Sequence, residues 1–309
     1  MFWVPCAGWK AGLIVVITHL QGGLGNQMFQ YSTGRALASC LGAELKVDLS
    51  WFDSIAKEEP PRSFMLDAFP GVHVAVASRQ ECEQLVYAQR RPLDFLLRRP
   101  RRHAASYVAE PYFSYWEGFE RLVAPLYLLG YWQNELYFNA VADTIRRDFT
   151  FPPLPAGAAA EAATHIRSVG NAVAIHVRRG DYVSNLVTHS FHGLCPSDYY
   201  GKALDTVAAH TASAPELFLF SDDPAWVREH FDTRGFPATV VDFPEHAEAP
   251  WHDMHLMSLC KHHIIANSSF SWWGAWLANT GGLICAPRRW FAEESKAADN
   301  PAPDRWILL

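Results

Sequence analysis

Ala172-Val173-Ala174-Ile175-His176-Val177-Arg178-Arg179-Gly180-Asp181 is the stretch that says most about the fold of this 309-residue chain. Its apolar first half predicts a buried β-strand, and two arginines follow where the strand gives way to a loop. In open α/β sheets, ligands bind at the carboxyl ends of the strands. Arginine presents a planar fork of donors that suits phosphate oxygens. The segment therefore predicts an anion site, unless Arg178 and Arg179 only pair with Asp181 and other carboxylates to hold the loop.

A glycine-rich turn between a strand and a helix lies near the N-terminus. Such a turn lets backbone N–H groups approach a phosphate or a sugar at a helix N-terminus. Gly23 and Gly25 fit the G-x-G-x-x-G dinucleotide fingerprint, but Met28 occupies its third glycine position. Asp48, after the next strand, could imitate the ribose-binding acid, so an NAD-dependent oxidoreductase is one alternative and a turn without a ligand is another. The expected elements are a strand at 12–19, the turn GGLGNQ at 22–27, a helix at 27–41 and a strand at 45–49.

Polar residues also follow two strands expected in the C-terminal half, at residues 217–220 and 262–266. Asp222 and Asp223 could cap the helix that begins at Pro224, contact ribose hydroxyls or a guanine edge, or bind a metal, although D-x-D spacing is absent. After the second strand, the polar run Asn267-Ser268-Ser269 begins a tryptophan-rich helix. One of these side chains could cap the helix, which leaves the other N–H groups and hydroxyls to face an anion.

Taken in order, these segments closely resemble the bacterial α-1,2-fucosyltransferases of glycosyltransferase family 11. The H-x-R-R-x-D element is similar to one in α-1,6-fucosyltransferases and is related to that of protein O-fucosyltransferases. The resemblance covers residues 16–291, nearly the whole chain. The matching stretches are GGLGNQMFQY (22–31), GYWQNELYF (130–138), HVRRGDYV (176–183), FLFSDDP (218–224) and HHIIANSSFSWWGAWL (262–277).

The resemblance implies an inverting, metal-independent transfer of L-fucose from GDP-β-L-fucose, with no cofactor besides this donor substrate. The expected acceptor is an oligosaccharide or lipid-linked glycan with a terminal galactose. The expected activity is that of a galactoside 2-α-L-fucosyltransferase in the synthesis of surface glycans such as O-antigen or capsule. A non-catalytic glycan-binding protein, which would use the many tryptophans, is an alternative of another class.

The phosphates of the donor have expected ligands among the matching residues. Arg178 is the expected principal ligand of the β-phosphate, with Ser268 and Ser269 assisting at their helix N-terminus, while Arg179 braces the loop. Donors at this place stabilise the leaving group more in the transition state than in the ground state. The other residues expected at the donor site are Gly23, Gly25, His176, Asp222, Asp223 and Asn267.

The resemblance extends to the guanine and the reaction centre. His176 and Asp223 match positions that read guanine in the α-1,6 enzymes, and Asn26 matches an asparagine near the reaction centre of protein O-fucosyltransferases. The general base that takes the acceptor proton stays open. Leu186 stands where the α-1,6 enzymes carry a glutamate, so Asp181 and His192 are the nearest titratable candidates.

Strands alternate with helices in both halves of the chain, which predicts an α/β fold with parallel sheets covered on both faces. Three prolines in residues 152–155 end a helix expected over residues 137–149 and predict a stiff linker between the halves. The resemblance implies two Rossmann-like domains that face a cleft, as in the glycosyltransferase B type. Residues 1–155 would form the acceptor-side domain with the glycine turn, and residues 165–309 the domain that binds GDP-fucose.

Composition narrows the partners and the location. The formal net charge of −6 argues against nucleic acid as a main partner, and the six scattered cysteines favour reduced thiols in a cytoplasmic protein. The apolar run at 11–17 is too short to span a bilayer and predicts the first strand. Residues Arg90–Arg102 contain six arginines around apolar residues. This segment predicts either peripheral contact with the inner membrane or a solvated helix or loop.

Overall fold

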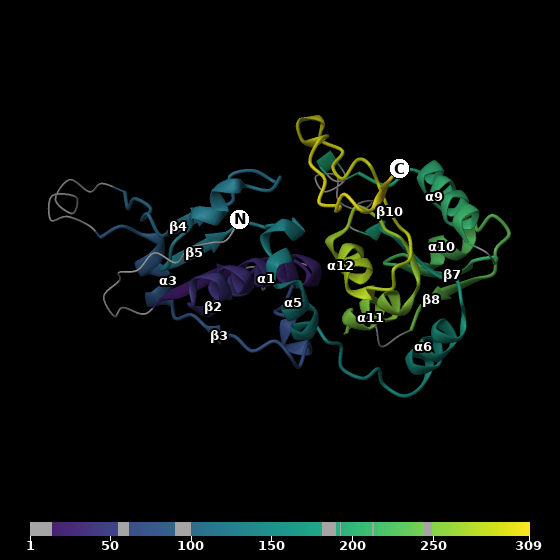
Figure 1. The fold of residues 1–309 in the computed structure, drawn as a ribbon, viewed down its shortest axis with the longest axis horizontal. Coiled ribbons are helices and arrows are strands. Elements are labelled where there is room, and N and C mark those ends of the chain that lie inside the picture. Colours follow the sequence, from purple (N-terminus) through teal and green to yellow (C-terminus); the bar gives the residue numbers. More distant parts are fainter. Residues whose placement is uncertain are drawn as a thin grey trace.

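The computed structural model describes residues 14–54, 62–89, 100–180, 190–191, 193–211, 213–243 and 249–309. Two parallel β-sheets dominate it, and each is formed by one half of the chain. Figure 1 shows the halves side by side, with α1 (Leu24–Leu41) of the first half next to α12 (Ser269–Ala278) of the second. The predicted α/β class with parallel sheets is therefore confirmed.

The first sheet has the strand order β3-β2-β1-β5-β4, and all of its neighbouring strands run parallel. Its central strand is rich in β-branched residues and buried on both faces, as expected when helices cover a parallel sheet. The strands are β1 (Val15–His19), β2 (Glu44–Asp48), β3 (Ala75–Val76), β4 (Tyr107–Ala109) and β5 (Leu126–Leu129). The helices are α1, α2 (Ser50–Ser54), α3 (Arg79–Val86) and α5 (Ala142–Asp148), with 3₁₀ turns at Leu66–Ala68, Glu117–Arg121, Glu135–Tyr137 and Asn139–Val141.

The second sheet has the order β11-β10-β9-β6-β7-β8 and is also parallel throughout. Every residue of its central strand β6 is buried, which confirms the strand predicted from the apolar run before the arginines. The strands are β6 (Ala172–Val177), β7 (Glu216–Ser221), β8 (Ala238–Val241), β9 (His262–Ile264), β10 (Ile284–Ala286) and β11 (Ile307–Leu308). The helices are α6 (Ala158–Ser168), α9 (Ser197–His210), α10 (Pro224–His230), α11 (Trp251–Leu259) and α12, with a 3₁₀ turn at Glu294–Lys296.

Two predicted helices have different bounds in the structure. α1 begins at Leu24 rather than at residue 27, so the glycine turn is partly its first turn, with Gly23 at the N-cap. Glycine disfavours a helix by about 1 kcal/mol, but packing against α12 overrides that preference here. The helix predicted over residues 137–149 is two 3₁₀ turns followed by the shorter α5.

Aromatic rings from both halves pack in one hydrophobic cluster. Phe29 of α1 lies 4.5 Å from Trp272, and Phe138 stacks on Trp273 with ring centroids 5.4 Å apart. The Trp276 Nε1–H donates to Glu135 over 3.0 Å. The halves therefore share part of one core, while the division into domains of residues 1–155 and 165–309 stays a prediction.

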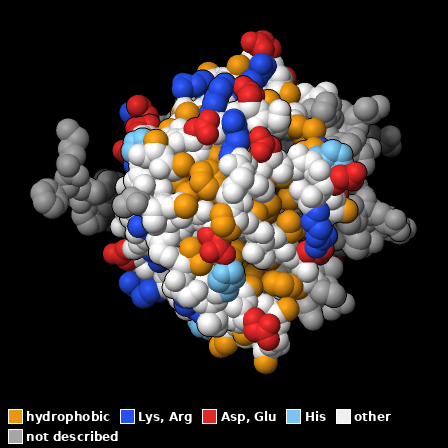
Figure 2. Space-filling model, turned by 90° about the vertical axis from the view of Figure 1, so that its right-hand side faces the viewer, with side chains coloured by type: hydrophobic (Ala, Val, Ile, Leu, Met, Phe, Trp, Pro, Cys, Tyr) orange, Lys and Arg blue, Asp and Glu red, His pale blue; other side chains and the backbone are white. Residues whose placement is uncertain are grey.

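The C-terminal segment also contacts the first half. Arg305 donates to both carboxylate oxygens of Glu135, and Trp306 belongs to the shared cluster. On the face shown in Figure 2, basic and acidic side chains are interspersed around apolar ones. None of the helices in the described ranges is long and apolar enough to cross a membrane, and the five cysteines described there are free thiols.

Candidate functional site

The polar segments that follow three neighbouring strands of the second sheet lie at one edge. β9, β6 and β7 are parallel neighbours, so the residues that follow these three strands lie beside one another. This places the Asn267-Ser268-Ser269 run, the two arginines and the two aspartates together, as the strand-end argument predicts.

Asp222 connects the two arginines. The Arg178 Nη1 lies 3.0 Å from Asp222 Oδ2, and the backbone N–H of Arg179 donates to Asp222 Oδ1 over 2.8 Å. Both side chains of the pair are about one quarter exposed. A Cβ at Gly180 would lie only 2.4 Å from Asp222 Oδ2, so a larger residue there would displace the Asp222 carboxylate. Asp222 thus fixes the loop that carries Arg178 at the carboxyl end of β6.

Arg179 and Asp223 form a second ion pair. The Arg179 Nε lies 3.3 Å from Asp223 Oδ2, and its guanidinium stacks 3.8 Å above the Trp226 ring. Asp223 also caps α10 by accepting from the Trp226 N–H. The capping interpretation is therefore confirmed for Asp223. Both arginines pair with aspartates that follow β7, so the predicted pairing with carboxylates that hold the loop is also observed.

His176 is the last buried polar side chain before the arginines. It is 4% exposed, and its ring lies 5.8 Å from that of Phe270 at the start of α12. The pKa of His176 is lowered to about 4, mainly by burial; the charge of Asp222 opposes this shift and the charge of Arg178 adds to it. The imidazole is therefore neutral near pH 7, and its Nδ1 has no hydrogen-bond partner among the described residues.

The N-terminus of α12 lacks the side-chain cap that the sequence predicts. Ser268 is the N-cap residue, but its hydroxyl makes no capping hydrogen bond. Asn267 instead donates to the carbonyl oxygens of Gly193 and Trp290, at 3.3 and 3.1 Å. The prediction that a side chain of this run caps α12 is therefore wrong. The Asn267 amide instead binds the two loops that contain Gly193 and Trp290.

Asn26 joins the two halves. Its Oδ1 accepts from Gln133 Nε2 and from the Ser269 hydroxyl, each over 2.8 Å. At Gly25, a Cβ would lie 2.5 Å from the Ser269 carbonyl carbon, and the Trp273 Nε1–H donates to the Gly25 carbonyl over 3.0 Å. We call these four residues of α1 and α12 (Gly25, Asn26, Ser269 and Trp273) the α1–α12 junction. The glycine pattern in this loop serves close helix packing, a reason that the sequence did not reveal.

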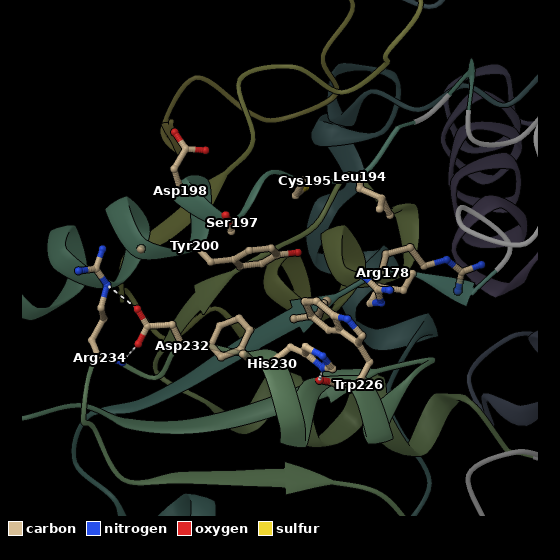
Figure 3. A pocket seen from close by; sticks show the side chains of 14 residues that line it. Arg178, Leu194, Cys195, Ser197, Asp198, Tyr200, Trp226, His230, Asp232 and Arg234 are labelled. Carbon is tan, nitrogen blue, oxygen red and sulfur yellow. Dashed lines mark hydrogen bonds and ion pairs between the residues drawn. The ribbon is translucent and has the colours of Figure 1, made fainter.

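A cavity of about 500 Å³ opens beside the two arginines. Figure 3 shows Arg178 at one end and Asp232 with Arg234 at the other, with Tyr200 and Trp226 between them. Of the predicted site residues that the structure describes, Arg178 and Arg179 are the two that line it. The sequence did not predict Tyr200, Trp226, Asp232 or Arg234 at the site. The position of Trp226 in the first turn after the capping Asp223 was the available signal.

Of the other predicted residues, some have partners in the structure and some lie outside the described ranges. Asp48 accepts from the Tyr127 hydroxyl at 2.6 Å and from the Ser50 N–H at 2.9 Å, so it has structural partners of its own. Asp181, His192 and residues 90–99 lie outside the described ranges. Within those ranges, no three His, Cys, Asp or Glu side chains are grouped so as to hold a metal ion.

Comparisons with known proteins show the family of this chain. The profile of Glycosyl transferase family 11 matches residues 107–309. An alpha-1,2-colitosyltransferase of Escherichia coli is 34% identical and covers 96% of this chain and 99% of its own length. The O-antigen biosynthesis glycosyltransferase WbnK of Escherichia coli is 31% identical, with 94% and 99% covered.

More distant relatives and solved structures were also found. The human galactoside alpha-(1,2)-fucosyltransferase 1 is 27% identical, over 83% of this chain and 64% of its own. A crystal structure of the NodZ alpha-1,6-fucosyltransferase soaked with GDP-fucose superposes with a TM-score of 0.45 and 17% identity, over 86% of this chain and 93% of that one.

Proposed function

Because this chain belongs to glycosyltransferase family 11, we propose that it transfers L-fucose from GDP-β-L-fucose to O-2 of a terminal galactoside, with inversion at the anomeric carbon. The chain is a glycosyltransferase, so the oxidoreductase and the non-catalytic lectin are no longer alternatives. The names of its relatives support a role in the synthesis of O-antigen or a similar surface glycan.

The observation that carries the proposal is the arginine-lined cavity at the carboxyl edge of the second sheet. Its end at Arg178 supplies a guanidinium for phosphate oxygens, and its walls of Tyr200 and Trp226 offer aromatic surface. A carboxylate such as Asp232 at the far end is an acceptor for the N–H groups of guanine. A nucleoside diphosphate fits this order of groups, with its phosphates towards Arg178.

The proposed mechanism uses the charge of these groups. As the bond from the sugar C1 to the β-phosphate oxygen breaks, negative charge grows on the phosphates, and Arg178 with the α12 N-terminus stabilises it. Asp222 keeps the Arg178 guanidinium in place at 3.0 Å. The β-configured donor then gives an α-linked product because the acceptor oxygen attacks from the opposite face.

The name of one relative supports a second donor sugar, colitose. The relative with 34% identity is named a colitosyltransferase, and colitose is the 3-deoxy analogue of L-fucose. If both sugars arrive on GDP, the contacts proposed at Arg178 would serve the nucleotide of either donor. The alternative function is therefore α-1,2-colitosyl transfer by the same site.

The test is transfer to Gal-β-1,3-GalNAc and Gal-β-1,4-GlcNAc from GDP-fucose, GDP-colitose and, as a control, GDP-mannose, each with EDTA present. We expect an α-1,2-linked product from GDP-fucose, identified by NMR, and none from GDP-mannose. A strong preference for GDP-colitose would establish the second candidate instead. Activity that needs added Mn²⁺ or Mg²⁺ would contradict metal independence, and no transfer from any GDP-sugar would overturn the proposal.

A membrane-associated acceptor remains a prediction. Residues 90–99 of the basic segment lie outside the described ranges, while Arg101 pairs with Glu83 at 3.2 Å. We propose peripheral contact of this segment with anionic lipids, which would bring a lipid-linked glycan to the enzyme. Sedimentation with vesicles that contain phosphatidylglycerol tests it, and an unchanged distribution after neutralising the six arginines would contradict it.

A further inference from the structure

Glu110 stands at the carboxyl end of β4, on the first sheet and far along the chain from the arginines. Its Oε2 accepts from the Tyr131 N–H over 2.7 Å, and its Oε1 accepts from the Trp132 N–H over 3.0 Å. A Cβ at Gly130 would lie 2.4 Å from the Glu110 Cβ, so the glycine allows this close approach. The carboxylate is thus held in one orientation by the loop after β5.

The same loop leads directly to the α1–α12 junction. Gln133, the residue after Trp132, donates to Asn26 Oδ1, which also accepts from Ser269. The chain after β4 contacts the second half as well, since the Ser114 hydroxyl donates to Asp299 at 3.0 Å and Phe113 packs 4.8 Å from Phe291. Glu110 therefore lies on the part of the first half that meets the second.

The surroundings of Glu110 favour proton uptake near neutral pH. Burial raises the pKa of Glu110 to about 7, against the lowering effect of the two backbone N–H donors and of Lys296 from the second half. The Glu110 charge in turn contributes to the raised pKa values of Tyr131 and Tyr137. A general base works best when its pKa lies close to the working pH.

Two aromatic side chains beside this carboxylate are exposed. Tyr112, two residues after Glu110, is 54% exposed, and Tyr131, whose N–H binds Glu110, is 41% exposed. Exposed large apolar rings next to a partly buried acid combine an apolar surface with a polar anchor, which is the chemistry of a pyranose site. On the nucleotide side, Asp222 and Asp223 are instead paired with Arg178 and Arg179.

We propose that Glu110 is the catalytic base for the acceptor and that Tyr112 and Tyr131 form the surface that receives the acceptor sugar. This inference rests on the proposed function. The acceptor O–H bond breaks, its proton passes to a Glu110 oxygen, and the acceptor oxygen forms the new bond to the sugar C1. The bond from C1 to the β-phosphate oxygen breaks, and GDP leaves with its electron pair.

A purely structural role of Glu110 predicts different behaviour. If the carboxylate only anchored the 130–133 loop, its loss would disturb Asn26 through Gln133 and lower stability and acceptor transfer together, without a specific change in the pH profile. If it takes the proton, kcat/KM of the wild type falls as the pH drops through about 7, because the carboxylate becomes protonated, and this limb disappears when the acid is replaced.

The experiment measures transfer kinetics, GDP affinity and melting for Glu110→Gln, Glu110→Ala and the matched control Glu117→Gln, which alters an exposed acid seven residues away. We expect Glu110→Gln to lose at least ~100-fold in kcat, typical of removing a general base, while GDP affinity stays within about twofold. Added formate should restore part of the activity of Glu110→Ala. Glu117→Gln should behave as the wild type.

Tyr131→Ala adds a test that does not depend on the acid. It keeps the backbone N–H that binds Glu110 and removes the ring, so the KM for the acceptor should rise about tenfold with the KM for the donor unchanged. This variant decides the matter if both Glu110 variants fail to fold, and an unchanged acceptor KM would then overturn the inference. Full activity of a folded Glu110→Gln would also overturn the inference. So would a Glu110→Ala variant that formate does not restore and whose residual activity keeps the acid limb of the pH profile. A wild-type protein that transfers no sugar from any GDP-sugar would instead refute the proposed function itself.

Discussion

The proposed role of Arg178 depends on the planar geometry of its guanidinium as well as on its charge. Its guanidinium contacts Asp222 at 3.0 Å, and that aspartate also binds the backbone of Arg179. A lysine would keep the charge but lose the planar fork that can bind a carboxylate and a phosphate at once. We expect Arg178→Lys to lower kcat at least ~100-fold, the loss typical of one transition-state donor.

The measurement compares initial rates and melting temperatures for Arg178→Lys and for Arg79→Lys. Arg79 pairs with Glu83 on an almost fully exposed helix surface and serves as the control. A normally melting Arg178→Lys that keeps most of its activity would mean that the phosphate ligand lies elsewhere.

Asn26 should act on turnover rather than on nucleotide affinity. Its amide oxygen is the shared acceptor of Gln133 and Ser269, and Asn26 does not line the cavity beside Arg178. We expect Asn26→Ala to lower kcat, while GDP binds within about tenfold of wild type, equivalent to about 1.4 kcal/mol.

Calorimetric titration with GDP and steady-state kinetics check this expectation. Gln133→Ala removes one of the two donors, so in the double variant its effect should add little to that of Asn26→Ala. Fully additive losses would mean that Gln133 acts independently of Asn26. A GDP affinity that falls far more than tenfold would place Asn26 in the nucleotide site.

Among elements, α1 and α12 show where sequence reasoning succeeds and where it stops. The ends of β6, β7 and β9 could be predicted because an apolar run followed by polar residues is a local pattern. The contact between Gly25 and Ser269 joins residues far apart in the chain, and no local pattern encodes it. For the same reason the walls of the cavity, such as Tyr200 and Trp226, were missed although Arg178 was found.

Gly25→Ala tests the close packing of these two helices. The added methyl group would lie 2.5 Å from backbone atoms of α12, which have no side-chain freedom to move away. We expect a lower melting temperature and strongly reduced transfer, because overpacking of this kind costs about 1–3 kcal/mol and displaces Ser269 from Asn26.

Gly170→Ala is the matched control, since a Cβ there meets no atom within 4 Å. It should melt and turn over like the wild type. Equal behaviour of Gly25→Ala and Gly170→Ala in both assays would show that α1 and α12 are not packed as closely as described.

For the whole molecule, buried histidines set the response to acid. Burial lowers the pKa of His176, His255 and His263 to about 4, below the ordinary value of about 6.5. The unfolded chain therefore binds more protons as the pH falls below 6.5, and stability is lost towards pH 4. Each histidine contributes a loss of about 2 kcal/mol between pH 7 and 5, whereas Glu110, whose pKa is raised to about 7, offsets about 2 kcal/mol.

The net expectation is a free energy of unfolding about 4 kcal/mol lower at pH 5 than at pH 7. Urea denaturation at both pH values measures it, and His263→Gln should reduce the difference while His210→Gln, at an exposed position, should not. Stability that rises on acidification in the wild type would contradict the buried, neutral histidines.

The shared aromatic cluster has a consequence for engineering donor preference by exchanging halves between family members. In a chimera whose two parents are joined within residues 152–155, Phe29 and Phe138 of one parent would pack against α12 of the other. Its tryptophans would then meet a surface shaped for other partners, and the Glu135 carboxylate would meet a foreign indole and guanidinium. Functional chimeras of this enzyme therefore require α12 and the segment through Trp306 to be transplanted from the parent that supplies the first half, although both follow the linker in the chain.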